Sequence, residues 1–259
     1  MSDSSGSRLT GGRVLAAVLI MAAPVHAESA EIRVGVASNF AGALADLAED
    51  FQRRTGHRLV ISSGSTGKLY AQIKNGAPFD VFLAADGERP QRLEEEGESI
   101  AGTRFTYAIG RLVLWSSQRD LVEGEGEVLT TNRFKRLAIA NPDTAPYGRA
   151  ARQALEALGQ WERLEPRLVR GENIAQTFQF VASGNAELGL VALAQTRSLR
   201  DERGSAWLLP ASLYHPIEQQ AVLLKSAREP GAARELLDYL RSPTVRKYLE
   251  SSGYETKSE

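Results

Sequence analysis

The chain has 259 residues, a formal net charge of −1 and no cysteine. The lack of cysteine excludes disulfides, thiolate metal sites and cysteine nucleophiles, and a chain of this length builds a core without them. Charges of both signs are scattered along the sequence, so neither nucleic acid nor an anionic membrane is indicated as a partner.

The N-terminal segment has the pattern of a secretory signal peptide. Two arginines precede the apolar stretch Val14–Ala23, and the small-residue sequence Pro24–Ala27 follows it. The apolar stretch is too short to span a bilayer, and the small residues resemble a cleavage site. We therefore expect residues 1–27 to be removed near Ala27 from an exported, periplasmic protein.

Two strand–turn–helix units open the remaining chain. Glu31–Ala37 is predicted to be a strand, and the helical spacing of apolar residues predicts a helix over Phe40–Thr55, with Ser38 or Asn39 suited to its N-cap. His57–Ile61 is the next predicted strand. Successive units of this kind favour a parallel sheet with right-handed crossovers, in which both turns lie at the carboxyl ends of their strands.

The second of these turns, Ser62–Gly67, is rich in small hydroxyl residues and precedes a helix predicted over Lys68–Asn75. The first N–H groups of a helix lack intrahelical partners and carry the positive end of the helix dipole, so an anion can bind there. The nucleotide-binding pattern GxxxxGK[ST] fails at Ser62 and at Leu69. The alternative is a turn whose serine and threonine side chains only cap the helix.

The middle of the chain predicts a buried strand over Phe79–Asp86, a charged helix over Glu88–Glu96 and one long strand over Tyr107–Trp115. The polar stretch Ser116–Glu127 carries no strong signal. We expect the chain to cross from one lobe to another along the long strand.

The second half repeats the alternation of strands, donor-rich turns and helices. The predicted strands are Leu137–Ala140, Glu187–Leu193, Leu208–Pro210 and the returning strand His215–Leu224, and the predicted helices are Arg149–Leu158, Ile174–Ala182, Glu229–Leu240 and Ser242–Ser251. Asn141–Gly148 and Val169–Asn173 lead into the first two of these helices.

This order of elements predicts an α/β, two-lobed periplasmic binding protein of type II, with a mixed, mainly parallel sheet flanked by helices in each lobe. Residues 28–110 and 218–259 would form lobe 1, and residues 111–217 would form lobe 2. Such proteins close by a hinge motion around a ligand in the interlobe cleft.

The sequence also resembles the periplasmic molybdate-binding proteins of ABC importers over nearly all of the chain after the leader. Four segments carry the resemblance: VGVASNFAGALADLAEDF, SSGSTGKLYAQIKNGAPFDVFLAAD, AIANPDTAPYGRAARQAL and GENIAQTFQFVASGNAELGLVA. The resemblance implies capture of molybdate, and also of tungstate, for delivery to a membrane permease and its ATPase. Molybdenum would be bound only as the oxyanion, without a cofactor.

In that family, hydroxyls and backbone amides from four turns hold the oxyanion without counter-charged side chains. Carried over, the resemblance implies ligand contacts from Ser38 and Asn39, from Ser65 and Thr66, and from the backbone N–H groups of Tyr147 and Ile174. The resemblance leaves open whether Ser65 or Thr66 is the main hydroxyl donor. A tyrosine hydroxyl that some members supply from a later strand is missing at Leu190–Ala192.

Donors alone suit molybdate, a tetrahedral dianion with no proton to donate at neutral pH. Phosphate keeps a proton and is penalised by a site without an acceptor. Glu172 and Asp143, beside the turns, are the residues that could upset this expectation. Sulfate also needs only donors, so the same fold binding sulfate is the alternative function.

An enzyme is not expected. His57 and His215 are the histidines beyond the leader, neither stands in a recognisable triad context, and no GxSxG occurs. Two histidines without paired carboxylates also make a weak ligand set for a metal-ion receptor. A monomer is the expected state for a carrier that must dock and release.

Overall fold

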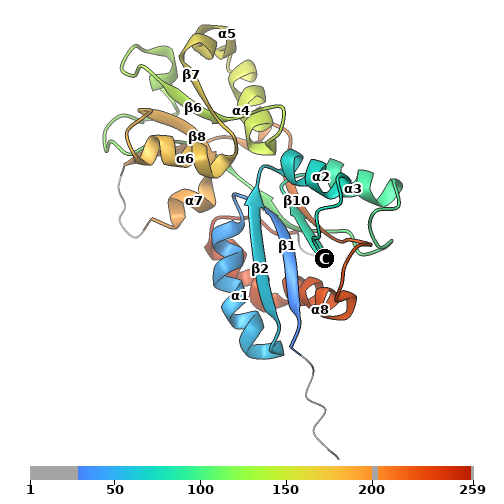
Figure 1. Ribbon diagram of the computed structural model, residues 1–259. Coiled ribbons are helices and arrows are strands. Elements are labelled where there is room, and N and C mark those ends of the chain that lie inside the picture. Colours follow the sequence, from blue (N-terminus) through green and yellow to red (C-terminus); the bar gives the residue numbers. More distant parts are fainter. Residues whose placement is uncertain (1–28, 200–203, 258–259) are drawn as a thin grey trace, which may run out of the picture.

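The computed structural model describes residues 29–199 and 204–257. The expected signal peptide, residues 1–27, lies outside these residues. They form two five-stranded sheets with helices packed on both faces of each (Figure 1). No helix in the described ranges is both long enough and apolar enough to cross a membrane.

The first sheet has the strand order β2-β1-β3-β10-β4. Its strands are β1 (Glu31–Ala37), β2 (Arg58–Gly64), β3 (Val81–Ala84), β4 (Phe105–Gly110) and β10 (Ile217–Leu223). Four strands run in one direction, and β10 is antiparallel to both of its neighbours. Because Ala37 pairs with Gly64, β1 and β2 end level and the turns that follow them lie side by side.

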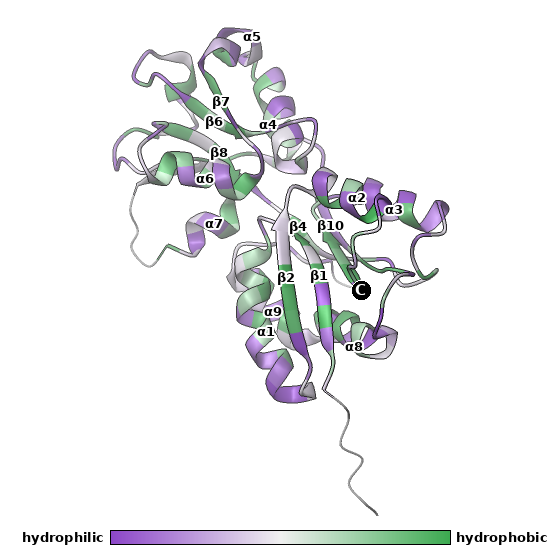
Figure 2. Ribbon diagram, viewed as in Figure 1, coloured by the Kyte–Doolittle hydropathy of each residue, from purple (hydrophilic) through white to green (hydrophobic). Residues whose placement is uncertain are grey.

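Helices cover the first sheet on both faces. They are α1 (Ala41–Thr55), α2 (Thr66–Lys74), α3 (Glu88–Glu95), α8 (Pro230–Arg241) and α9 (Pro243–Ser251). The predicted apolar stripe of α1 is buried at Leu44, Leu47 and Phe51, in one core cluster with residues of α8 and α9. Leu69 and Leu93 pack from α2 and α3 on the other face. Each such side chain stabilises the fold by about 2 kcal/mol. Figure 2 shows green, apolar stretches within the strands and a mixture of purple and green along the helices.

The second sheet has the order β7-β6-β8-β5-β9. Its strands are β5 (Leu112–Ser116), β6 (Leu137–Ala140), β7 (Leu168–Gly171), β8 (Leu188–Ala192) and β9 (Ser205–Leu208), and its helices are α4 (Pro146–Ala157), α5 (Trp161–Leu164), α6 (Ile174–Ala182) and α7 (Leu193–Arg197). Again four strands share one direction and one, β5, opposes them. The predicted fold class, with mixed and mainly parallel sheets, is confirmed.

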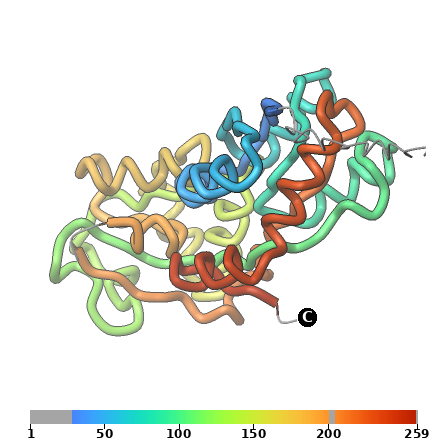
Figure 3. The backbone as a smooth tube through the Cα atoms, turned by 90° about the horizontal axis from the view of Figure 1, so that it is seen from below, coloured from blue at the N-terminus to red at the C-terminus, as the bar shows by residue number. Residues whose placement is uncertain are grey.

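The prediction of one long strand over Tyr107–Trp115 was wrong. The chain breaks at Arg111: Gly110 pairs with Ile217 in the first sheet, and Leu112 pairs with Ala192 in the second. Because residues on the two sides of Arg111 pair in different sheets, one continuous strand cannot belong to both sheets. Figure 3 shows this passage in green, and a second passage in orange to red precedes β10.

Four smaller differences remain. Strand β7 lies where the sequence predicts only a turn over Val169–Asn173, because this edge strand is four residues long and only partly buried. The strand expected at Leu208–Pro210 is β9, four residues long and displaced toward the N-terminus, where it pairs with β5. The short helices α5 and α7 were not predicted, because helices of four and five residues carry too few apolar repeats to be recognised.

Candidate functional site

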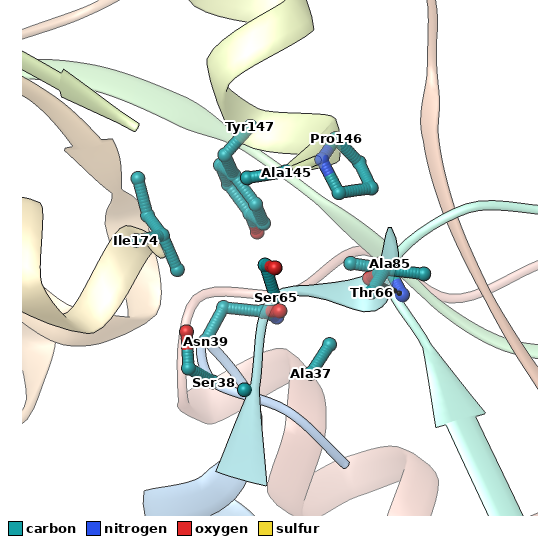
Figure 4. A pocket seen from close by; sticks show the side chains of 11 residues that line it. Ala37, Ser38, Asn39, Ser65, Thr66, Ala85, Ala145, Pro146, Tyr147 and Ile174 are labelled. Atoms are coloured by element: carbon teal, nitrogen blue, oxygen red, sulfur yellow. Dashed lines mark hydrogen bonds between the residues drawn. The ribbon is translucent and has the colours of Figure 1, made fainter. Parts of the chain in front are cut away.

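Four strand-to-helix turns, two from each sheet, meet at a small cavity between the two halves of the molecule (Figure 4). The cavity measures about 10 Å³, on the order of one water molecule. Its lining is formed by Ala37, Ser38, Asn39, Gly64, Ser65, Thr66, Ala85, Ala145, Pro146, Tyr147 and Ile174. All six residues that the sequence predicted for the site therefore lie together.

The first turn, after β1, does not cap its helix through a side chain. Phe40 is the N-cap of α1, so the expected capping role of Ser38 or Asn39 is wrong. The backbone N–H of Ser38 donates to the Gly64 carbonyl at 2.9 Å. Its hydroxyl oxygen accepts from the Ala175 N–H of the opposite half at 3.4 Å and keeps its own hydrogen to donate.

The second turn, after β2, contains two hydroxyls that differ in whether the protein itself supplies a hydrogen-bond partner. Helix α2 begins at Thr66, two residues earlier than predicted. The Thr66 hydroxyl oxygen accepts from the Ala85 N–H at 3.1 Å. The Ser65 Oγ is buried and has no hydrogen-bond partner among the described residues. Ser65 therefore has its full hydrogen-bonding capacity available to the cavity.

The third turn ends in Pro146, the first residue of α4. Proline has no N–H, and the Tyr147 N–H, one residue later in the first turn of the helix, has no intrahelical acceptor. The Tyr147 side chain is buried, and its hydroxyl has no partner in the described part of the chain. Burial raises the pKa of Tyr147 well above its ordinary value, and the nearby Tyr254, Tyr214 and Tyr107 raise it further. The hydroxyl therefore stays protonated.

The fourth turn leads into α6. Asn173 is its N-cap, and the Asn173 side chain accepts from the Gln176 N–H at 3.0 Å. Because this cap satisfies the N–H of the third helical residue, the Ile174 N–H at the first position remains without an intrahelical acceptor. Ile174 is buried against the cavity.

None of the lining residues is charged. Lys68 forms an ion pair with Glu172 across the two halves, and both side chains are more than half exposed. Asp143 is exposed, and Arg149 pairs with Glu88 at 2.8 Å. The carboxylates flagged in the sequence thus lie outside the lining, and the cavity offers neutral donors at the first turns of helices.

Gln219, which lies behind the site, was not predicted as part of it. Gln219 is fully buried on β10, and its Oε1 accepts from Asn39 Nδ2 at 2.8 Å. The available signal was an amide pair, Gln219 and Gln220, which together with Glu218 interrupts the apolar residues of β10.

The described residues contain no group of three or more histidine, aspartate or glutamate side chains placed to hold a metal ion. His57 is buried, and its Nδ1 accepts from the Ala30 N–H at 3.0 Å, which gives it a structural role. His215 is exposed, and its backbone N–H donates to the Gln153 side chain at 3.0 Å.

Comparison with known proteins identifies the family. Residues 32–255 match the model of the family described as bacterial extracellular solute-binding protein. The chain is 50% identical to the molybdate-binding protein ModA of Azotobacter vinelandii over 88% of this chain and 91% of that protein. It is 43% identical to the molybdate-binding protein ModA of Rhodobacter capsulatus over 95% and 96% of the two chains.

The solved structures give the same result. The Azotobacter vinelandii periplasmic molybdate-binding protein superposes with a TM-score of 0.85 at 43% identity, over 88% of this chain and all of that one. These relatives are binding proteins, in agreement with the expectation that the chain is not an enzyme. The chain belongs to the bacterial extracellular solute-binding proteins, in the group of the molybdate-binding proteins ModA.

Proposed function

We propose that the protein captures molybdate, and also tungstate, in the cavity between its two halves. The observation that carries this proposal is the cavity itself, where four turns bring hydroxyls and backbone N–H groups together without a charged side chain. The relatives named as molybdate-binding proteins support the choice of ion. The same relationship supports the further proposal that the ion is delivered to an ABC permease and its ATPase in the membrane.

The proposed contacts divide by type of donor. Hydroxyls come from Ser38, Ser65 and Thr66, an amide from Asn39, and backbone N–H groups from Tyr147 and Ile174. Ser65 is proposed as the main hydroxyl donor of the second turn. Its Oγ has no protein partner in the described ranges, whereas the Thr66 oxygen already accepts from Ala85.

The charge of the ion would be balanced by dipoles. Helices α2, α4 and α6 each begin at the cavity, so the positive ends of their dipoles point toward one place. Each helix end contributes on the order of 0.5 kcal/mol when exposed and more when water is excluded. A doubly charged oxyanion gains from all of them at once.

The proposed lobes are residues 28–110 with 218–259, and residues 111–217. In the described structure the Gly67 N–H of the first donates to the Thr144 carbonyl of the second at 2.9 Å. The two halves are thus in contact around a cavity of about 10 Å³. An oxyanion is larger than one water molecule and can therefore enter only when the lobes separate. We further propose a periplasmic monomer, with the signal peptide cleaved near Ala27.

A thermal-shift titration of the mature protein tests the ion. A ligand that binds only the folded state raises the melting temperature by mass action. Molybdate and tungstate are expected to raise the melting temperature at micromolar concentrations, whereas sulfate and phosphate are not. A rise with sulfate alone would replace the proposal by its alternative, a sulfate-binding protein with the same four turns.

A further inference from the structure

A buried polar cluster lies behind the cavity and holds the side chain of Asn39. The cluster consists of Asn39, Tyr107, Gln219 and Tyr254. Gln219 Oε1 accepts from Asn39 Nδ2 at 2.8 Å and from the Tyr107 hydroxyl at 3.2 Å. The Tyr254 hydroxyl donates to the Asn39 backbone carbonyl at 2.9 Å. Residues from β4, β10 and the C-terminal segment thus meet at one ligand-binding turn.

Two polar atoms of this cluster lack hydrogen-bond partners. Asn39 Oδ1 and Gln219 Nε2 are buried, and neither has a partner among the described residues. A buried N–H without an acceptor is costly, and Nε2 carries two such donors. Because Asn39 Nδ2 is directed to Gln219, the other edge of the amide, Oδ1, is the one left for the cavity that Asn39 lines. A carbonyl oxygen repels an anion.

In a second arrangement, the amide nitrogen and the amide oxygen of each side chain, Asn39 and Gln219, exchange positions. If both amides rotate by half a turn, Gln219 Nε2 donates to Asn39 Oδ1 and to the Tyr107 oxygen. The Tyr107 hydroxyl then donates to the Ala84 carbonyl, which lies 3.4 Å away. Both donors of Gln219 are used, and Asn39 Nδ2 faces the cavity. What remains unpartnered is the Gln219 carbonyl oxygen, and an under-satisfied carbonyl is tolerated better than an N–H.

We propose that Gln219 is a positioning and specificity residue: with the oxyanion bound, it holds Asn39 with Nδ2 toward the ligand and keeps Asn39 Oδ1 occupied. This inference rests on the proposed function. Since Gln219 donates to Asn39 Oδ1, the cavity offers no amide acceptor for the proton of phosphate. Gln219 therefore excludes protonated oxyanions without touching them.

Replacing Gln219 by methionine tests the inference, because methionine has a similar shape and no strong hydrogen-bonding group. In Gln219→Met the Asn39 amide is free to turn either edge toward the ligand. We expect molybdate affinity to fall about tenfold, as for a lost charge-assisted hydrogen bond, and phosphate affinity to rise relative to molybdate. Gln220→Met is the matched control, since the Gln220 amide bonds to Arg104 and Thr106 instead.

A double-mutant cycle with Asn39→Ala separates positioning from general destabilisation. If Gln219 acts through Asn39, Gln219→Met adds no further loss of molybdate affinity, and no gain for phosphate, in the Asn39→Ala background. Affinities come from titration calorimetry, and the melting temperature of each ligand-free variant reports on folding. Additive losses, or an unchanged ratio of phosphate to molybdate affinity, would overturn the role of Gln219. Failure of the unmutated protein to bind molybdate would instead overturn the proposed function.

Discussion

At the scale of single residues, the site depends on hydrogen-bonding capacity that the protein itself does not use. The Ser65 hydroxyl is buried without a partner in the described residues, and the Ser38 hydroxyl accepts one hydrogen bond while keeping its hydrogen. Groups of this kind destabilise a folded protein unless a ligand satisfies them. Their concentration around one cavity supports the proposal of a ligand that is a strong acceptor.

Ser65→Ala is expected to weaken molybdate binding about tenfold to a hundredfold, because one hydrogen bond to a charged group is worth roughly 1.5–3 kcal/mol. The ligand-free protein should be at least as stable as before, since the removed hydroxyl is buried without a protein partner. Titration calorimetry with Ser63→Ala, an exposed serine of β2, provides the control. Equal affinities in the two variants would remove Ser65 from the site.

The buried tyrosines predict how stability depends on pH. Burial raises the pKa values of Tyr147 and Tyr107 well above the ordinary value of 10.0, and it raises that of Tyr254 as well. The folded state therefore keeps protons that the unfolded chain loses above pH 10.0. The contribution of these tyrosines to the free energy of unfolding is complete below pH 10.0 and is lost as pH rises further.

Urea unfolding between pH 8 and pH 11 checks this dependence. We expect little change from these groups up to about pH 9 and a steep loss of unfolding free energy above pH 10. Replacing Tyr107 by phenylalanine should reduce the steepness. A free energy of unfolding that stays constant up to pH 11 would contradict the burial of these hydroxyls.

How far single residues could be predicted depends on where their partners lie in sequence. The six predicted residues stand in the turns themselves, and all of them line the cavity. Gln219 lies 180 positions from Asn39, and no local pattern connects the two. The sequence also assigned Ser38 or Asn39 to the cap of α1, because residue type alone does not distinguish a cap from a ligand contact.

At the scale of elements, the predicted alternation of strands and helices reproduced the fold because apolar periodicity is local. The stripe Leu44, Leu47 and Phe51 of α1 and the buried strand β3 are examples. The break at Arg111 was not predictable in the same way. The residues on both sides of it are apolar and suited to strands, and only the pairing with β10 and β8 assigns them to different sheets.

Helix α2 approaches the opposite half so closely that only glycine fits at its second position. A Cβ at Gly67 would lie 2.9 Å from the Thr144 carbonyl oxygen and 3.1 Å from Arg89 Nη2. Gly67→Ala should therefore hinder closure and weaken molybdate binding, although alanine stabilises a helix by up to about 1 kcal/mol relative to glycine.

Gly42→Ala in α1 is the matched control, because a Cβ there meets nothing within 4 Å. We expect Gly42→Ala to raise the melting temperature and leave affinity unchanged. Calorimetry and thermal unfolding of both variants measure the two effects separately. Unchanged affinity in Gly67→Ala would show that ligand binding does not require the contact with Thr144.

At the scale of the whole molecule, two ion-pair groups bridge the halves beside the cavity. Lys68 pairs with Glu172, and Arg149 pairs with Glu88 at 2.8 Å and with Asp86 at 3.6 Å. Their side chains are mostly exposed, apart from Asp86, and exposed pairs contribute roughly 0.2–1 kcal/mol each. They therefore adjust the balance between open and closed forms without supplying most of the binding energy.

Replacing both Lys68 and Arg149 by methionine is expected to raise the dissociation constant of molybdate less than about tenfold, mainly through faster release. Stopped-flow measurement at low and high salt checks this, because the unmutated protein should lose affinity with salt more than the double variant does. Arg133→Met, which removes an exposed pair with Glu123, is the control. A loss as large as that expected for Ser65→Ala would assign the ion pairs a greater share of the binding energy.

The most direct test of the account is a crystal structure of the protein with molybdate, in which molybdenum is located by its anomalous scattering. We predict one molybdenum position in the cavity of Figure 4, with oxygens in hydrogen-bond distance of the Ser65 hydroxyl, the Asn39 amide and the Ile174 N–H. The lining would contain no charged side chain. A molybdenum position elsewhere, or an oxyanion held by an arginine or a lysine, would contradict a site built from neutral donors alone.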